Sequence, residues 1–202
     1  PEYKANRTGK RPQAYDEIRE YMQKHHGAQV SKGIEADDLV SIAANALRDN
    51  LVEHVVCSID KDLNTFPGIK YNYVKDYTYT VSREEANKAF ITQIITGDKS
   101  DNILGMKFLD VKKSSPWYTM AKDNGLLSKR LGPVRAAKII EALEAGCIGS
   151  GVSLNFFLSS LFADRMDELE LNGTLLWMTR EVKNGEPVRF DLARWINFEE
   201  GG

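Results

Sequence analysis

Seven acidic residues gather at three places in the first half of the chain. They are Glu35, Asp37, Asp38, Asp60, Asp62, Asp98 and Asp101. Carboxylates a few ångströms apart repel one another and raise each other's pKa, so such a group is costly unless a cation compensates it. Mg²⁺ suits such a site, because it takes oxygen ligands and keeps several waters. Two such ions about 4 Å apart would activate water and stabilise the leaving oxygen in phosphodiester hydrolysis.

Each acidic cluster also has an ordinary structural explanation. Acids in a first helical turn face the helix dipole favourably, and "DKD" and "DKSDN" are typical of turns. A calcium loop over residues 60–71 is excluded, because Thr65 stands where the loop needs Gly and Tyr71 where it needs a bidentate Glu. The hydrolytic hypothesis therefore depends on the three clusters meeting in one place.

The elements predicted around the acids favour such a meeting. A helix over residues 35–50 starts in the first cluster, a short apolar strand ends just before Asp60, and Asp98 follows a helix that Ser82 and Glu85 begin with a capping box. In open α/β sheets, sites gather at the carboxyl ends of the strands. The apolar face expected for the helix over 35–50 consists of Leu39, Ile42, Ala43, Ala46 and Leu47.

The order of elements predicts an α/β fold with a helical C-terminal half. Strands are expected in "IKYNYV" and "DYTYTV", which are rich in aromatic and β-branched residues. Helices dominate after residue 97, so we expect a partial catalytic domain over residues 1–97 and a helical DNA-binding region over residues 98–202. The further helices predicted lie over residues 12–26, ended by Gly27, and over 131–143, 153–162 and 168–182.

The distribution of charge indicates a polyanion-binding face more than the net charge of −2 does. Residues 107–138 hold eight Lys or Arg against two acids, and residues 1–33 hold seven against four. Separated basic zones are typical of nucleic-acid binding, although solvated surface also produces them. With only two cysteines, no disulfide framework is expected, and a reducing cytoplasm fits the composition. No run approaches the roughly 18 apolar residues of a membrane span.

Four motifs in this order, "YKANR", "GIEADD", "SIDKD" and "TGDKSDN", closely resemble the 5′-nuclease superfamily. That group includes flap endonucleases and bacteriophage 5′→3′ exonucleases with ribonuclease H activity, and the chain is most similar to the phage type. The matches run from Tyr3 to about Leu143. The resemblance implies a PIN-like parallel sheet flanked by helices.

The resemblance also implies roles for the matched positions. Two Mg²⁺ ions, for which Mn²⁺ can substitute, would be held by the seven acids. Asp62 would stand between the first site, around Glu35, and the second, around Asp98. Lys4 and Arg7 match basic residues that contact the scissile phosphate, where they would neutralise charge developing in the transition state. A solvated basic terminus is the structural alternative for these two residues.

A helix–three-turn–helix motif that binds duplex DNA, often around a K⁺ ion, is the second feature that the resemblance implies. "GDKSDNILG" opens the motif and "LGPVRAAKIIEAL" is similar to its second helix. An expansion from Met106 to Arg130 separates the halves and leaves K⁺ binding open, and Trp117 within it would stack on a base or pack on the domain. The expected DNA-binding residues are Lys107, Lys112, Lys113, Lys129, Arg130, Gly132, Arg135 and Lys138.

The chain departs from the family at its start. Family members have an N-terminal strand bearing a metal-binding Asp and another Asp before the basic motif, and neither stands in this sequence. We therefore expect an N-terminally truncated chain whose first metal site binds weakly.

These observations predict a metal-dependent, structure-specific 5′ nuclease that removes RNA primers or 5′ flaps during phage-type DNA replication, in a bacterial or phage-infected cytoplasm. The expected partners are flapped or nicked duplex DNA, an RNA–DNA hybrid and replication proteins such as single-strand-binding protein, with no membrane. A DNA-binding module without catalysis is the alternative, and a calcium-binding acidic protein is a third reading of the same acids.

Overall fold

The computed structural model describes residues 9–106, 112–115, 117–127, 131–147, 150, 152–162 and 165–197. Its helices are α1 (Tyr15–His26), α2 (Ala36–Asp49), the short 3₁₀ helix η1 (Lys61–Thr65), α3 (Arg83–Thr96), α4 (Tyr118–Asp123), α5 (Pro133–Cys147), α6 (Leu154–Phe162), α7 (Met166–Leu176) and α8 (Leu192–Ile196). Its strands are β1 (Val55–Cys57), β2 (Gly68–Asn72), β3 (Tyr77–Val81), β4 (Gly97–Asp98), β5 (Ile103–Leu104), β6 (Val182–Lys183) and β7 (Glu186–Pro187).

The main sheet is mixed and has the order β1-β2-β3. β1 and β2 are parallel, with Val56 opposite Lys70, whereas β2 and β3 are antiparallel, with Lys70 opposite Tyr79. The predicted α/β class and the three strands are confirmed. The sheet is not parallel throughout, because only the turn 73–76 joins β2 to β3, and a parallel pair needs a crossover of a dozen or more residues.

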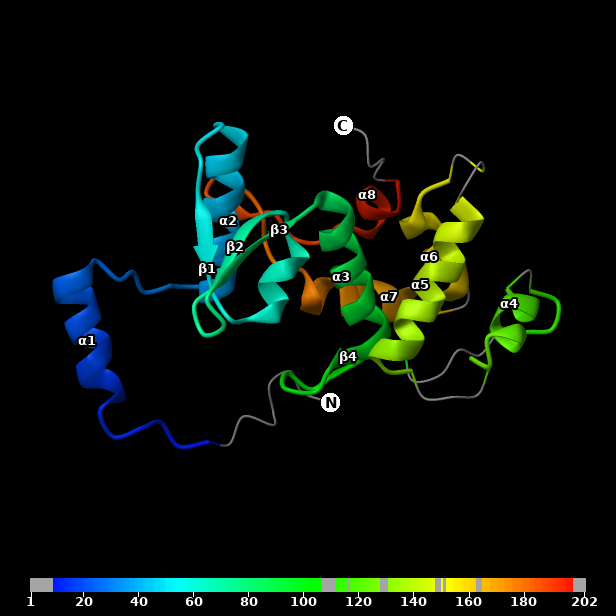
Figure 1. Ribbon diagram of the computed structural model, residues 1–202, viewed down its shortest axis with the longest axis horizontal. Coiled ribbons are helices and arrows are strands. Elements are labelled where there is room, and N and C mark those ends of the chain that lie inside the picture. Colours follow the sequence, from blue (N-terminus) through cyan, green and yellow to red (C-terminus); the bar gives the residue numbers. More distant parts are fainter. Residues whose placement is uncertain are drawn as a thin grey trace.

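Helix α1 stands to one side of the other elements (Figure 1). It ends as predicted at Gly27, whose left-handed backbone closes the helix with a bond from its N–H to the Met22 carbonyl. None of its residues is buried, and Ile18 and Tyr21 are exposed. In the part of the chain that the structure describes, no helix is both long and apolar enough to cross a membrane.

Helix α2 turns a different face inward from the one that its apolar residues predict. Ser41, Ala44 and Asn45 are its buried residues, and Leu47 is exposed. The Asn45 amide donates to the Ser41 carbonyl oxygen at 2.7 Å, so this polar side chain is satisfied inside the helix. The apolar pattern predicted the wrong face, because Ala44 is the one residue of the helix that packs into the small buried cluster that includes Phe66 and Met178.

Helix α3 forms the centre of the molecule. Ser82 and Glu85 make the predicted capping box, with bonds of 3.0 and 2.7 Å between each side chain and the other's backbone N–H. The helix packs against η1, α5 and α7, and Figure 1 shows α3, α5 and α7 next to one another. The apolar side chains that it buries in the main core are Phe90, Ile91, Ile94 and Ile95.

A hairpin of β4 and β5 follows α3 directly. Gly97 has a φ of +69°, and a Cβ on either Gly97 or Gly105 would collide with the backbone of the other strand. The two glycines therefore let the hairpin fold tightly onto the helix end, which fixes Asp98 beside it. This hairpin occupies the opening of the motif expected for DNA binding.

The expanded segment between this hairpin and α5 contains α4, which the sequence did not predict. The Trp117 indole N–H donates to the Ser160 hydroxyl at 2.7 Å, and its ring meets the Phe157 ring edge-to-face at 5.1 Å. Trp117 thus packs on the domain, the second of the two roles considered for it.

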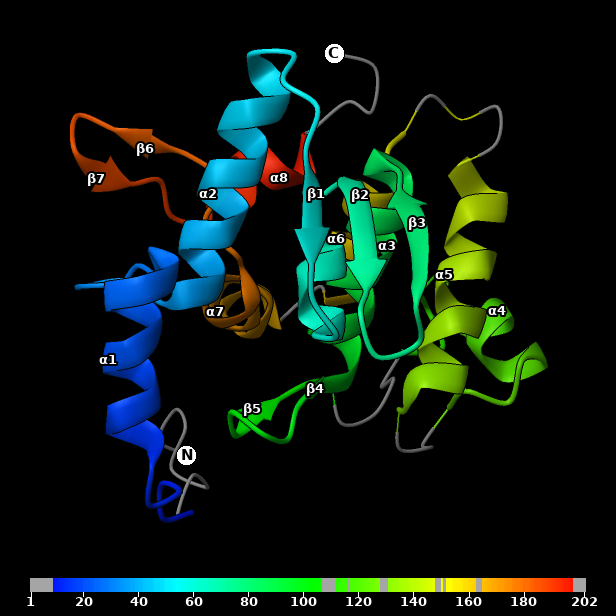
Figure 2. The same cartoon turned by 60° about the vertical axis from the view of Figure 1, so that its left-hand side comes forward.

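The C-terminal helix predicted to reach residue 182 ends earlier, at Leu176. Residues 177–181 instead run in extended form past α2, where the Thr179 N–H donates to Asp38 at 2.7 Å. The β6–β7 hairpin and α8 complete the chain (Figure 2). The Trp177 ring packs against the rings of Phe90 and Phe190, which anchors this segment to the core.

Candidate functional site

Six of the seven acids singled out in the sequence border one cavity of about 470 Å³. They come from the start of α2, from η1 and from the β4–β5 hairpin, so residues on both sides of position 97 contribute. The segment 174–179 and Phe190 complete the wall. The acids at this cavity are Glu35, Asp37, Asp38, Asp62, Asp98 and Asp101.

Asp62 brings the second acidic cluster to the wall of this acidic cavity. The Gln93 amide on α3 donates to one of its carboxylate oxygens at 2.6 Å and so fixes the side chain. Burial raises the pKa of the Asp62 carboxyl above its ordinary value, and the charges of Asp60 and Asp98 raise it further. The repulsion expected from the sequence therefore acts between residues that are far apart in the chain.

The α2 end of the cavity shows the same effect. Burial raises the pKa of Asp37, and the charges of Glu35 and Asp38 add to the rise. The backbone N–H of Asp38, which donates to Asp37 at 3.0 Å, partly opposes it. The Asp38 carboxylate is itself engaged by the Thr179 N–H, so Asp38 also ties the C-terminal segment to α2.

The other acids serve local structure as well. Asp60 caps η1 by accepting the Asp62 N–H at 3.0 Å, and its exposed side chain does not line the cavity. Asp98 accepts the N–H of Ser100 at 2.6 Å and that of Asp101 at 3.3 Å, which closes the hairpin turn. The structural explanations and the shared cavity thus hold together for these residues.

The acids of the cavity are candidate ligands for a divalent cation. Among the described residues, no three His, Cys, Asp or Glu side chains come close enough to hold one ion between them. The acids therefore surround the cavity without forming a closed cage. Their chemistry fits a hydrated Mg²⁺, which one or two carboxylates bind directly while the others accept hydrogen bonds from its waters.

The residues predicted to bind DNA lie away from the cavity or outside the described residues. Lys4, Arg7, Lys107, Lys129 and Arg130 belong to the second group. Arg135 and Lys138 are exposed on α5, and Lys112 and Lys113 are exposed before α4. Gly132 precedes α5, where its carbonyl oxygen accepts the N–H groups of Arg135 and Ala136.

Three residues of the cavity went unnoticed in the sequence. Gln93 stands in the middle of a helix, Thr179 lies in a segment predicted as helix, and Arg189 is a single exposed charge near the C-terminus. An uncharged amide inside an amphipathic helix carries no local signal of function. Gln93 falls eight residues before Asp101, on the helix that leads into the third acidic cluster, and only this proximity pointed to it.

No protein-family model matches the chain, and no curated protein matches it in sequence. Its chain path is similar to that of solved structures from bacteriophage T5. One, a T5 protein co-crystallised with metal ions, is 19% identical with a TM-score of 0.43, over 85% of this chain and 76% of that chain. A flap endonuclease in complex with DNA and metal ions is 16% identical with a TM-score of 0.41, over 84% and 78%.

A variant of the T5 5′-exonuclease is 14% identical with a TM-score of 0.39, over 77% of this chain and 76% of that chain. At this identity and TM-score the similarity concerns the course of the chain. The chemistry of this chain has to be inferred from its own residues.

Proposed function

We propose that this chain is a metal-dependent nuclease that hydrolyses phosphodiesters at the acidic cavity, with a 5′ flap or an RNA primer on duplex DNA as its substrate. The observation that carries the proposal is the gathering of six carboxylates, from segments more than sixty positions apart, around one cavity. Burial, and after it the charges of neighbouring acids, raise the pKa values of Asp37 and Asp62, and a bound cation would relieve both costs.

Two Mg²⁺ ions are proposed, one near Glu35 and Asp37 and the other near Asp98 and Asp101, with Asp62 between them. Mn²⁺ is expected to substitute. When bound, the ion supplies a Lewis acid that lowers the pKa of water and neutralises charge on the phosphate. Asp60, outside the cavity wall, would contribute its charge to the affinity for the ion.

The chain's own residues supply orientation. The Gln93 amide holds the Asp62 carboxylate in one position, and the Thr179 N–H does the same for Asp38. Side chains fixed in this way need not reorganise during the reaction, which is the main source of electrostatic catalysis. Arg189, which also lines the cavity, places a positive charge where the phosphate of a substrate would enter.

Duplex DNA would be held through its backbone rather than through its bases. Arg135 and Lys138 are exposed at the start of α5, and backbone contacts fix register without reading sequence. Lys112, Lys113 and Gly132 are proposed to extend this contact, together with Lys107, Lys129 and Arg130, which lie outside the described residues. Lys4 and Arg7 are proposed to contact the scissile phosphate, and K⁺ binding at the hairpin after α3 remains part of the proposal.

A cleavage assay with matched variants tests the proposal. The substrate is a labelled 5′-flap duplex, or an RNA–DNA hybrid, with Mg²⁺ or Mn²⁺. The variant Asp98→Asn removes one cavity charge, and Glu170→Gln removes an exposed charge on α7 that does not line the cavity. We expect Asp98→Asn to abolish cleavage and Glu170→Gln to cleave like the unmodified chain.

One observation favours a second candidate, a DNA-binding module without catalysis. No three acids among the described residues lie within reach of a single ion, so the cavity could lack the affinity that catalysis needs. Salt-sensitive binding of the flap duplex with no cleavage, even with Mn²⁺, would establish the module and reject the nuclease.

A further inference from the structure

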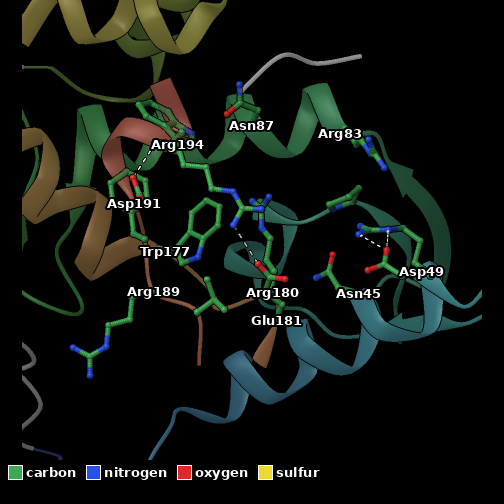
Figure 3. Close-up of a pocket in the computed structure, with 15 residues that line it drawn as sticks. Asn45, Asp49, Arg83, Asn87, Trp177, Arg180, Glu181, Arg189, Asp191 and Arg194 are labelled. Carbon is green, nitrogen blue, oxygen red and sulfur yellow. Dashed lines mark hydrogen bonds and ion pairs between the residues drawn. The ribbon is translucent and has the colours of Figure 1, made fainter. Parts of the chain in front are cut away.

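A second cavity of about 340 Å³ lies beside the acidic one and is lined by arginines (Figure 3). The arginines come from α2, from the start of α3, from the segment after α7, from the approach to α8 and from α8 itself. Three acids, Asp49, Glu181 and Asp191, also line it, which leaves a formal excess of two positive charges. The five arginines of this arginine cavity are Arg48, Arg83, Arg180, Arg189 and Arg194.

The three acids are already engaged. Arg48 pairs with Asp49 at 3.0 Å, and Arg194 pairs with Glu181 at 3.3 Å. Asp191 caps α8, because its carboxylate accepts the backbone N–H of Arg194 at 2.9 Å. The carboxylates of the cavity therefore offset the charges of Arg48 and Arg194, but Arg194 contacts Glu181 through Nη1 alone and keeps further N–H groups for a phosphate.

Arg180 carries the clearest uncompensated charge. Its guanidinium lies over the Trp177 ring at 4.2 Å and donates one hydrogen bond, to the Thr65 carbonyl oxygen at 2.6 Å. Its Nε is buried and has no hydrogen-bond partner among the described residues. Burial, with the nearby charge of Arg48, lowers the pKa of Arg180 to about 10. A buried cation without a counter-ion is costly, and an anion in the cavity would relieve that cost.

The arginine cavity and the acidic cavity are adjacent and share a wall. Trp177, Arg189 and Phe190 line both. Figure 3 shows Arg189 extending away from Arg180 and Arg194. Along α3, Asn87 marks the arginine cavity and Gln93 the acidic one, and six residues of helix span about 9 Å. Successive phosphates of one strand are separated by about twice the 3.4 Å rise along the axis, because the strand winds round it, so this distance corresponds to one or two nucleotides.

We propose that the arginine cavity binds a backbone phosphate of the same nucleic-acid strand that occupies the acidic cavity, one or two nucleotides from the phosphate held there. This inference rests on the proposed nuclease function. Guanidinium groups suit phosphate because their planar donors form paired hydrogen bonds with its oxygens. The shared wall favours a continuous strand over a free phosphate or mononucleotide, which has the same chemistry.

The test is a binding cycle without catalysis. Flap duplexes that each carry one neutral methylphosphonate, at successive positions, are bound to the chain in EDTA and measured by fluorescence anisotropy. At one position one or two nucleotides from the flap junction, we expect about a tenfold loss of affinity, the size of one charged hydrogen bond. The same loss is expected for Arg194→Gln with the unmodified duplex, and no further loss when variant and methylphosphonate are combined.

Controls distinguish the sources of phosphate and the possible failures. Arg19→Gln, on α1, should keep the full methylphosphonate effect, and Arg180→Gln should repeat the Arg194→Gln result if it folds. Equal methylphosphonate losses in the unmodified chain and in Arg194→Gln overturn the proposal. A thermal shift with inorganic phosphate or a mononucleotide that Arg194→Gln abolishes, without coupling to the duplex, assigns the cavity to a free phosphate and also overturns it. Because no arm requires cleavage, an inactive chain that shows the coupling rejects the nuclease and keeps the phosphate site.

Discussion

Lys70 provides the sharpest physical prediction, because it is a lysine inside the small core beneath the sheet. It lies in the middle of β2 and is only 2% exposed, and its Nζ has no hydrogen-bond partner among the described residues. Its only compensation there is the Phe66 ring, whose centroid is 3.4 Å from the Nζ. We predict that Lys70→Met, which preserves volume and removes the charge, stabilises the fold.

The magnitude follows from the pKa. Burial lowers the pKa of Lys70 from 10.5 to about 8, and each unit corresponds to about 1.4 kcal/mol, so the charged form is penalised by about 3 kcal/mol. The ring face of Phe66 returns about 1–2 kcal/mol of this as a cation–π contact. At neutral pH we therefore expect Lys70→Met to raise the free energy of unfolding by about 1–2 kcal/mol.

The pH dependence gives the prediction a second, independent sign. Between pH 8 and 10.5 the unfolded chain binds more protons at Lys70 than the folded chain does, so the stability of the unmodified protein rises with pH. The advantage of Lys70→Met is therefore complete below pH 8 and disappears above pH 10.5. Urea unfolding followed by circular dichroism, at about pH 7 and about pH 10, measures both values.

The control is Lys75→Met, which removes an exposed lysine from the turn between β2 and β3. We expect it to change the free energy of unfolding by less than about 0.5 kcal/mol at either pH. The reasoning is refuted if Lys70→Met destabilises the fold at neutral pH, or if its effect is the same at both pH values.

Three further outcomes follow from the structure. Burial and the neighbouring acids raise the pKa of Asp62, so the stability of the fold falls as pH rises above the ordinary pKa of an aspartate. In thermal scans in EDTA, Asp62→Asn should therefore raise Tm at neutral pH and raise it less in acid. The variant should also reduce the further rise in Tm that Mg²⁺ produces. Ser82→Ala removes the capping box of α3 and should cost about 1 kcal/mol in urea unfolding, whereas an unchanged midpoint would mean that the cap contributes nothing. A Cβ on Gly173 would collide with the Phe190 ring, so Gly173→Ala should destabilise by about 1–3 kcal/mol, and a neutral result would show that the ring moves freely.

The sequence predicted what local chemistry decides. The Ser82–Glu85 box, the Gly27 helix end and the strands on either side of the turn 73–76 all depend on residues close together in the chain, and the structure has them as expected. The meeting of the acids was predictable because each cluster stands at an element boundary, and such boundaries share one edge of the sheet.

Long-range packing decided the features that the sequence did not predict. Residues 177–181 have the composition of a continuing helix, yet Trp177 packs on Phe90 and the Thr179 N–H reaches Asp38, which is 141 positions away. The arginine cavity exists because that segment leaves the helix, so scattered arginines gave no signal of it. The prediction for the inward face of α2 was wrong for a similar reason, because the sequence does not show which side chains pack against that helix.

Mn²⁺ binding tests the central physical claim most directly, namely that acids distant in sequence form one cation site. Mn²⁺ can be titrated into the metal-free chain and its free fraction measured by electron paramagnetic resonance. We predict saturable binding that Asp62→Asn and Asp37→Asn each weaken by at least about tenfold, and that Glu170→Gln leaves unchanged. Equal binding by all four chains, or saturable binding by none, would contradict a cation site in the acidic cavity.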